Sequence, residues 1–144
     1  DSHCIEKSTI ESIPLVPFEN IEAQYPSSNY NMIIAVGFTK MNAIREQKYF
    51  EAKQKGYTLI NYIHPSVVLH NNIKMGDNNI ILEYVSIHPY SQLGSGCFIS
   101  SNTNVGHGCI LEDFCWLNAG VSIGGESVLG KQTFLGMKTI FIIE

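Results

Sequence analysis

Apolar side chains recur at every sixth position through the C-terminal part of the chain. Written in sixes from Val67, the sequence has an apolar residue in the third column of all thirteen rows, without one insertion. At 44% hydrophobic composition, chance would give such a column with a probability on the order of 10⁻⁵. The third column contains Leu69, Met75, Ile81, Ile87, Leu93, Ile99, Val105, Leu111, Leu117, Ile123, Leu129, Leu135 and Phe141.

A period of six cannot keep one face of a 3.6-residue helix, but it fits short strands joined by tight bends. The first column is small or branched, and we expect it to point inward together with the third. Glycine occupies the fourth column in six rows, and we expect it at corners whose backbone angles a Cβ would resist. Because single repeats of this kind bury little surface, they must stack into a solenoid. The six glycines are Gly76, Gly94, Gly106, Gly124, Gly130 and Gly136.

The N-terminal part follows a different pattern, which is typical of α/β structure. The apolar run 31–36 is closed by Gly37 and predicts a buried strand, and the run 58–63 predicts a second one. Between them, residues 39–55 predict a helix with Gly56 as its C-terminal cap. These elements form one β-α-β unit, half of a nucleotide-binding type of sheet. The apolar or long side chains near helical spacing are Met41, Ile44, Lys48 and Ala52.

The two patterns predict a mostly β protein with two domains. We expect a small, partly Rossmann-like α/β domain over residues 1–63 and a β-helix over residues 64–144. The chain begins at Asp1 without a methionine, and we expect the first domain to be incomplete at its N-terminus.

Composition and charge narrow the function classes. A net charge of −4 argues against a nucleic-acid-binding protein, which would gather Lys and Arg on one face. No apolar run approaches the roughly 20 residues that span a bilayer, and no signal peptide begins the chain, so we expect a cytoplasmic protein without a membrane segment. The cysteines form no CxxC pair and are expected to be small core residues in a reducing compartment. They are Cys4, Cys97, Cys109 and Cys115.

Several motifs accompany the repeats. They are Ile34-Ala-Val-Gly37 with Arg45 in the following helix, Ile63-His-Pro-Ser66, Val105-Gly-His-Gly-Cys109 and Val121-Ser-Ile-Gly-Gly125. With these motifs the chain resembles the hexapeptide-repeat acyltransferases, and among them the sugar acetyltransferases with an N-terminal nucleotide-sugar-binding domain. Sialic acid O-acetyltransferases and bacillosamine-pathway N-acetyltransferases belong to this branch.

The resemblance implies a three-sided, left-handed β-helix with eighteen residues per coil. It also implies a homotrimer that binds acetyl-CoA between neighbouring β-helices and a nucleotide-linked sugar partly through the N-terminal domain. The expected reaction is acetyl transfer to an amino or hydroxyl group of that sugar, for surface polysaccharide or glycan synthesis. Which atom accepts the acetyl group, and which sugar carries it, stays open.

The resemblance also assigns candidate site residues. It gives His107 the role of general base, gives the Gly125 N–H the role of oxyanion donor, and places Trp116 and Met137 along the CoA path. In such enzymes Asp or Glu usually follows the histidine, whereas this chain has Gly108.

Acyl transfer from a thioester needs a base for the acceptor's proton and a donor for the oxyanion. Near pH 7 a histidine has a substantial neutral fraction, so it suits the first role. Adding eighteen to 107 predicts that Gly125 lies directly over His107 on the next coil, where it would let the thioester approach the backbone. Without the resemblance, His107 would be interpreted as a polar corner residue.

Other patterns leave alternatives open. His70 and His88 are eighteen residues apart and raise the possibility of a metal site, but the three-histidine spacing of β-helix carbonic anhydrases is absent, so we expect no metal. A metal-dependent hydratase and a non-catalytic binding or scaffold β-helix are the competing functions. An outward apolar ladder predicts a trimer contact, with cover by the N-terminal domain or by a C-terminal segment missing from this chain as the alternative. The ladder consists of Ile80, Phe98, Trp116 and Phe134.

Overall fold

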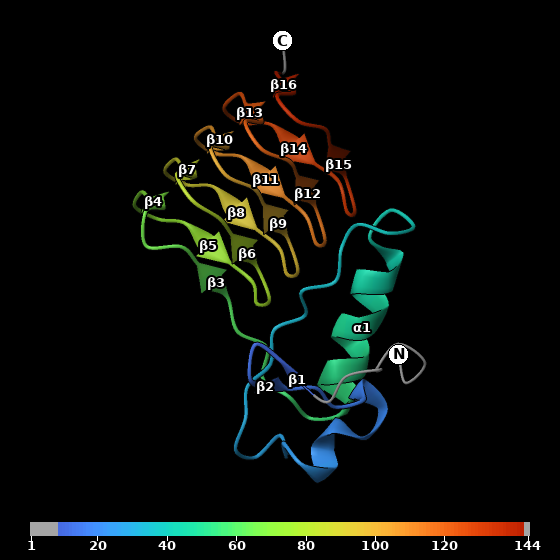
Figure 1. Ribbon diagram of the computed structural model, residues 1–144. Coiled ribbons are helices and arrows are strands. Elements are labelled where there is room, and N and C mark those ends of the chain that lie inside the picture. The colour runs from blue at the N-terminus through green and yellow to red at the C-terminus, as the bar shows by residue number, and fades with distance from the viewer. Residues whose placement is uncertain (1–8, 143–144) are drawn as a thin grey trace.

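A computed structural model describes residues 9–142 of the chain (Figure 1). From Tyr62 onward, each row of the repeat forms one two-residue strand followed by a bend. The strands form parallel ladders in which each residue pairs with the one eighteen positions away, as Val105 does with Ile123. One coil therefore takes three rows and has three faces. The predicted parallel β-helix is confirmed.

The three sheets define the faces of the solenoid, which we number 1 to 3. Face 1 contains β4 (Val68–Leu69), β7 (Ser86–Ile87), β10 (Asn104–Val105), β13 (Ser122–Ile123) and β16 (Ile140–Phe141). Face 2 contains β5 (Lys74–Met75), β8 (Gln92–Leu93), β11 (Ile110–Leu111) and β14 (Val128–Leu129). Face 3 contains β3 (Tyr62–Ile63), β6 (Ile80–Ile81), β9 (Phe98–Ile99), β12 (Trp116–Leu117) and β15 (Phe134–Leu135).

The interior is filled by the first and third columns, as the sequence predicts. Third-column side chains from Ile81 to Leu129 are buried, so the hydrophobic effect holds the coils together. The first column has a second task. Its small polar side chains donate to fourth-column carbonyls one coil on, as Ser91 Oγ does to Gly106 O at 2.9 Å and Cys109 Sγ to Gly124 O at 3.2 Å. These bonds satisfy carbonyl groups that would otherwise be buried without a partner.

The cysteines of the solenoid belong to this inner column. Cys97, Cys109 and Cys115 are buried free thiols, which confirms that they are small core residues. Burial raises the pKa of the Cys109 thiol, and a hydrogen bond with Cys115, together with burial, raises that of Cys97. Both thiols are therefore protonated at neutral pH. Cys4 lies outside the described residues.

The corners differ from the expectation. Left-handed φ values occur in the sixth column, where all twelve residues from Asn72 to Lys138 have φ between 54° and 72°. The fourth-column glycines do not have positive φ. Several of them are needed for a different reason, which is close approach between coils: a Cβ on Gly94 would lie 2.7 Å from the main-chain nitrogen of Asp113. The expectation of corner backbone angles at the fourth column is thus wrong.

We name the corners by their contents. The His107 corner, between faces 1 and 2, has Asn72, Tyr90, Gly108 and Glu126 in its sixth column. The α1 corner, between faces 2 and 3, has Asn78, Gly96, Phe114 and Gln132. The third corner, between faces 3 and 1, has Tyr84, Asn102, Gly120 and Lys138.

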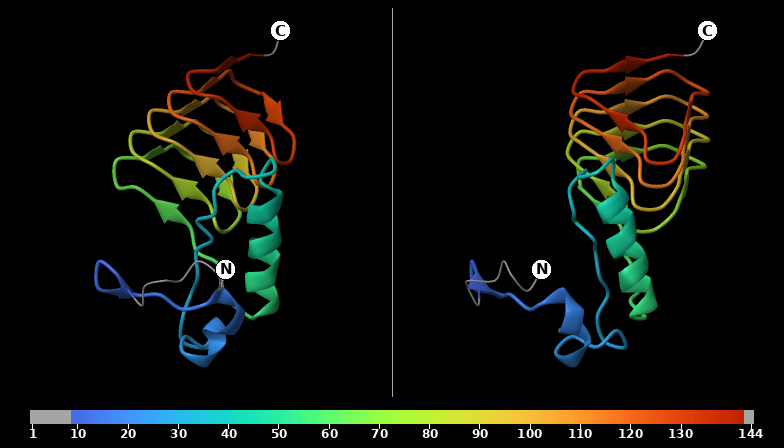
Figure 2. Two further views of the ribbon diagram at one scale, coloured as in Figure 1. Left: turned by 45° about the vertical axis from the view of Figure 1, so that its right-hand side comes forward. Right: turned by 90° about the vertical axis from the view of Figure 1, so that its right-hand side faces the viewer.

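The N-terminal region contains little regular structure besides one helix. Its elements are β1 (Thr9–Ile10), β2 (Ile13–Pro14), the 3₁₀ segment η2 (Phe18–Ala23) and α1 (Ala43–Gln54). Figure 2 shows the coils stacked along one axis and α1 running roughly along it. In the described part of the chain, no helix has the length and apolar character needed to cross a membrane.

The predicted β-α-β unit is present only in reduced form. Its two strands meet in a single parallel bridge between Met32 and Leu59. The rest of the second predicted strand leaves the unit, because Tyr62–Ile63 is β3 and pairs with β6 of the solenoid. The extended segment after Met32 is held instead by Asn78, whose Oδ1 accepts from the Ile34 N–H at 2.7 Å.

The helix is shorter than predicted and turns a different face inward. It begins at Ala43 because the residues before it form turns with positive φ, while Gly56 caps the other end with φ 86° as expected. Its buried residues are Arg45, Tyr49 and Ala52, and Met41 is 61% exposed. Polar side chains are buried because α1 packs on a corner that presents main-chain carbonyl groups.

Candidate functional site

His107 lies in the fifth column of the His107 corner, after β10 and before β11. Its side chain is exposed. Helix α1 packs along the α1 corner and segment 31–38 lies against face 3, so neither covers this corner. The histidine is therefore open to a ligand from solvent or from another chain.

Gly125 lies against the imidazole of His107, as the eighteen-residue spacing predicts. A Cβ on Gly125 would lie 2.4 Å from Cε1, 2.7 Å from Nδ1 and 2.9 Å from Nε2 of His107. Any side chain at this position would therefore displace the ring. Within the described residues the Gly125 N–H donates no hydrogen bond, so it is available to an oxygen atom brought beside His107.

Gly106 is a further part of this site, and the sequence analysis did not single it out as functional. A Cβ on Gly106 would lie 2.6 Å from the Gly125 nitrogen and 2.8 Å from the Gly124 carbonyl carbon. Glycine is therefore required both for the coil spacing and for leaving the Gly125 N–H uncovered. The signal that could have identified it is the stacking of a fourth-column glycine beneath a fifth-column one on the next coil.

The residues beside His107 and Gly125 complete the corner. Gly108 has φ 64°, and its N–H donates to Pro89 O at 3.0 Å. On the next coil, Glu126 donates its N–H to His107 O at 2.7 Å, and its Cγ would lie 3.4 Å from a Cβ on Gly108. Glu126 thus lies over the position that directly follows the histidine.

His70 and His88 stack on the same corner, nearer the start of the solenoid. Their rings are 4.9 Å apart with planes inclined by 22°, and His88 Nε2 lies 3.1 Å from Asn104 Oδ1. Among residues 9–142, no three His, Cys, Asp or Glu side chains gather closely enough to hold a metal ion. The pair is a polar surface feature beside His107.

Trp116 is not brought together with His107. It is on β12 of face 3, the face opposite the His107 corner, and only 8% of it is exposed. Phe98 stacks on the indole with ring centroids 3.9 Å apart, and Phe38 and Arg45 contact it from the N-terminal region. Within this chain Trp116 has a packing role, and its contact with CoA stays a prediction. Met137 lies at the third corner, is 70% exposed, and stays a prediction.

The apolar ladder on face 3 is partly covered within the chain. Phe38 packs on Phe134 at 5.0 Å between ring centroids as well as on Trp116, and Ile80 is 8% exposed. The alternative, cover by the N-terminal domain, is confirmed for part of the ladder, whereas Phe98 and Phe134 are only half-buried and the trimer contact stays a prediction. Sequence patterns could not decide this because they do not show where residues 31–38 run.

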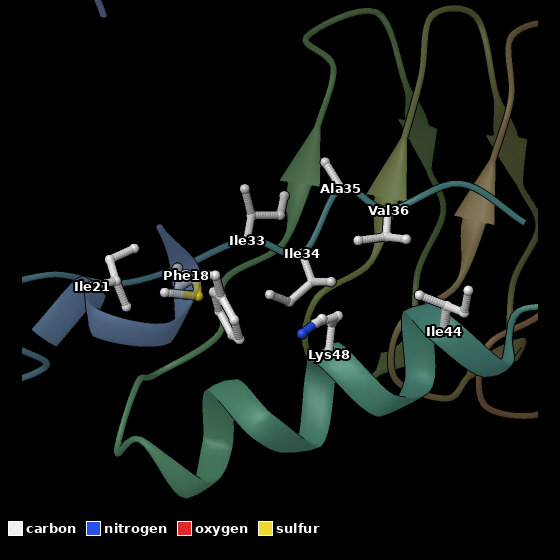
Figure 3. A pocket seen from close by; sticks show the side chains of 9 residues that line it. Phe18, Ile21, Ile33, Ile34, Ala35, Val36, Ile44 and Lys48 are labelled. Carbon is white, nitrogen blue, oxygen red and sulfur yellow. The ribbon is translucent and has the colours of Figure 1, made fainter. Parts of the chain in front are cut away.

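An apolar cavity of about 470 Å³ separates the parts of the N-terminal region (Figure 3). Side chains of η2, of the extended segment 33–36 and of α1 point into it, and Lys48 supplies its charged group. Gly37 lies just beyond this segment and is exposed. The cavity and the His107 corner are on different sides of the solenoid, so one chain does not combine them.

No protein-family model matches the chain. Its structure is similar to the acetyltransferase domain of PglB from Neisseria gonorrhoeae, with a TM-score of 0.84, 21% sequence identity and 93% of this chain covered. The chain spans 64% of the length of that domain. The same domain in complex with acetyl coenzyme A matches with a TM-score of 0.66 and 21% identity, over 93% of this chain and 67% of that one.

A second similar protein is perosamine N-acetyltransferase from Caulobacter crescentus, in complex with CoA and GDP-perosamine and with one histidine changed to asparagine. It matches with a TM-score of 0.55 and 18% identity, over 93% of this chain and 74% of that one. These comparisons confirm, at the level of the fold, the predicted resemblance to β-helix sugar acetyltransferases.

Proposed function

We propose that this chain transfers an acetyl group from acetyl-CoA to an amino or hydroxyl group of a nucleotide-linked sugar. The observation that carries the proposal is the contact between the His107 ring and Gly125, whose N–H has no partner among the described residues. A base and an unused donor side by side are what acyl transfer from a thioester requires. The similar proteins, whose structures contain acetyl coenzyme A, CoA or GDP-perosamine, support the same choice.

In the proposed reaction His107 removes the proton of the acceptor N–H or O–H while the acceptor atom attacks the thioester carbonyl. The new C–N or C–O bond forms, and the Gly125 N–H stabilises the oxyanion. Breaking the C–S bond then releases CoA, whose sulfur takes the proton from His107. Removing one such oxyanion donor typically costs a factor of about 10²–10³ in rate.

The acetyl group passes directly from donor to acceptor. Cys97, Cys109 and Cys115 lie inside the solenoid, where they donate hydrogen bonds to main-chain carbonyls. All three sulfur atoms are buried, where a substrate cannot reach them. None of these three residues therefore serves as a carrier, and both substrates must be bound at once.

We also propose that the active unit is a homotrimer. Face 3, which the N-terminal region covers, is opposite the His107 corner, so a sugar nucleotide held by that region must meet His107 of a neighbouring copy. Acetyl-CoA would then lie between two solenoids, with Met137 a candidate contact along its path. Three copies of the 16.1 kDa chain would sediment together at micromolar concentration if the proposal holds.

The test is calorimetric binding of acetyl-CoA to the chain and to its Gly125→Trp variant. We expect the chain to bind and the variant to fail, because an indole at position 125 would displace the imidazole and fill the space above it. Gly130→Trp is the matched control, since Gly130 is exposed, lies on the α1 corner and has no atom closer than 4.0 Å to an added Cβ.

Release of CoA thiol is then measured with a panel of amino-sugar and hydroxyl-sugar nucleotides. We expect His107→Ala to lower the rate by a factor of about 10²–10⁴ while leaving the midpoint of unfolding unchanged. Absence of acetyl-CoA binding by the unmodified chain would overturn the proposal and favour a non-catalytic β-helix. Zinc bound at His70 and His88, with hydration activity, would favour the metal-dependent alternative.

A further inference from the structure

We propose that Glu126 is the positioning residue for His107, accepting a hydrogen bond from its imidazole across one coil. The inference rests on the proposed function, and it names the group that orients the base. A catalytic histidine that acts as a base is generally oriented by a third group, most often a carboxylate. In this chain the residue after His107 is glycine and cannot serve.

Glu126 is the carboxylate that the topology brings to this place. Among residues 9–142, Glu126 is the one acidic residue in columns four to six of the His107 corner. The outward second-column positions of faces 1 and 2 add no further acid in the same range. All other described acids of the solenoid lie at the α1 corner or the third corner: Asp77, Glu83, Glu112 and Asp113.

Two contacts fix Glu126 relative to His107. The main-chain bond from its N–H to His107 O, 2.7 Å long, sets the register of the two residues. The side chain passes over Gly108, since its Cγ would lie 3.4 Å from a Cβ there. Adjacent coils are separated by about 4.8 Å, a distance that a glutamate side chain spans.

The carboxylate is free to reach the ring. It is exposed, and it forms no hydrogen bond or salt bridge with the described residues. The His107 ring likewise has no hydrogen-bond partner in this range. Turning the Glu126 side chain toward His107 therefore breaks no hydrogen bond or salt bridge among residues 9–142. Glycine at 108 leaves room for this movement, because a side chain there would touch Glu126.

The bond would select one tautomer of the imidazole. The nitrogen that donates to Glu126 keeps its hydrogen, so the other nitrogen presents its lone pair to the acceptor. This is a positioning role, because Glu126 touches neither substrate. Its loss should therefore reduce kcat more than it changes KM.

The test compares Glu126→Gln with the unmodified chain in the acetyl-transfer assay. We expect kcat to fall on the order of tenfold, a fraction of the 10²–10⁴ typical of the base itself, with KM for acetyl-CoA unchanged. Glutamine fits the backbone, because Gln132 occupies the same column with φ 62°. Glu83→Gln is the matched control, since it changes a carboxylate at the third corner that bonds to Ser101; its kcat should stay unchanged.

Rescue and a spectroscopic readout separate positioning from a structural effect. Gly108→Asp in the Glu126→Gln background returns a carboxylate beside His107, at a φ that Asp tolerates, and should restore kcat. Nitrogen-15 NMR of the imidazole, assigned with a His107→Asn variant, should show one tautomer in the unmodified chain and a mixture in Glu126→Gln.

The outcomes distinguish the two proposals. If the unmodified chain transfers no acetyl group, the proposed function fails, and the NMR comparison still decides whether Glu126 orients His107. If transfer occurs but Glu126→Gln retains full kcat and a single tautomer, the inference is overturned while the function stands.

Discussion

The His107 corner and the α1 corner have the same backbone conformation, but only the second is covered by another part of the chain. Gly108 has φ 64° and Phe114 has φ 59°, each in the sixth column of its row. Yet Phe114 is 1% exposed beneath α1, whereas the His107 corner is uncovered. The fold therefore provides three equivalent edges, and the side chains in columns four to six decide what each edge does.

At the α1 corner, side chains of α1 and of its N-cap residue bind polar groups of the bends. Asn42 Nδ2 donates to Phe114 O at 2.9 Å, Arg45 Nε donates to Gly96 O at 2.8 Å, and Tyr49 OH donates to Asp77 at 2.6 Å. At the His107 corner neither α1 nor segment 31–38 covers the bends, and the Gly125 N–H has no hydrogen-bond partner among residues 9–142. Columns four to six contain four glycines at each of the two corners, so the difference lies in their cover: the corner under α1 supports the structure, and the uncovered corner is open to a ligand.

The largest expected effect comes from breaking the packed corner at Arg45. Arg45 Nε and Nη1 donate to Gly96 O and Val36 O, and burial lowers the pKa of this guanidinium to about 10. We expect Arg45→Ala to lower the free energy of unfolding by about 3–5 kcal/mol, because it leaves two buried carbonyls unpaired and a cavity beside Trp116.

Urea denaturation would measure the loss of Arg45. Gln47→Ala on the exposed side of α1 is the control and should change stability by no more than about 0.5 kcal/mol. Equal effects of the two substitutions would show that α1 is not anchored through Arg45.

The comparison is sharpened by adding one methyl group at each corner. Gly106→Ala should destabilise the protein by about 2–3 kcal/mol, because the new Cβ would overlap the backbone of Gly124 and Gly125. Gly130→Ala, in the same column at the α1 corner, meets no atom closer than 4.0 Å. It should be neutral or stabilise by up to about 1 kcal/mol.

Thermal unfolding of both glycine variants measures the difference in stability between them. Acetyl transfer, measured on the folded fraction, should fall only for Gly106→Ala, because its Cβ covers the Gly125 N–H. Similar destabilisation by the two substitutions would contradict the close approach of position 106 to the backbone of Gly124 and Gly125.

The smallest expected effect is electrostatic and concerns Asp77. Burial opposes its ionisation, but hydrogen bonds from Lys53, Tyr49 and Ser95 outweigh burial and lower the pKa of Asp77 below its ordinary value of 3.8. A lowered folded-state pKa contributes stability above that ordinary value, and this contribution is lost as the pH falls through the folded-state pKa.

Asp77→Asn should therefore cost about 0.5–1 kcal/mol at pH 7, a modest amount because the pair with Lys53 is partly exposed. It should also reduce the decline of stability below pH 4. Glu19→Gln on the exposed side of η2 is the control. An unchanged acid limb in Asp77→Asn would refute the contribution of this carboxylate.

The solenoid was predictable because its signal repeats thirteen times in one column. The stacking of Gly125 on His107 followed from the same arithmetic, since a separation of eighteen residues is one coil. A periodic pattern gives the spacing of the repeat, and this spacing is sufficient to predict which residues stack on each other within a solenoid.

What could not be predicted depends on contacts between the two regions. Arg45 belongs to the motifs that resemble the sugar acetyltransferases. Nothing in the helical pattern of residues 39–55, however, indicates that an arginine faces inward. The packing of Phe38 on Trp116 could not be predicted, because the two residues are 78 positions apart in the chain. Glu126, by contrast, could have been found by the same arithmetic, since it lies eighteen residues after Gly108 and just beyond the motif that ends at Gly125.

The eighteen-residue coil has a consequence for changes in chain length. Inserting or deleting eighteen residues would add or remove one coil and return every later row to its own face. Inserting six would move each later row to the next face, so that Gly125 would no longer follow His107 along the axis. Length variation among proteins built this way should therefore cluster at multiples of one coil, whereas single-row changes should accumulate only where no stacked partner has to be kept.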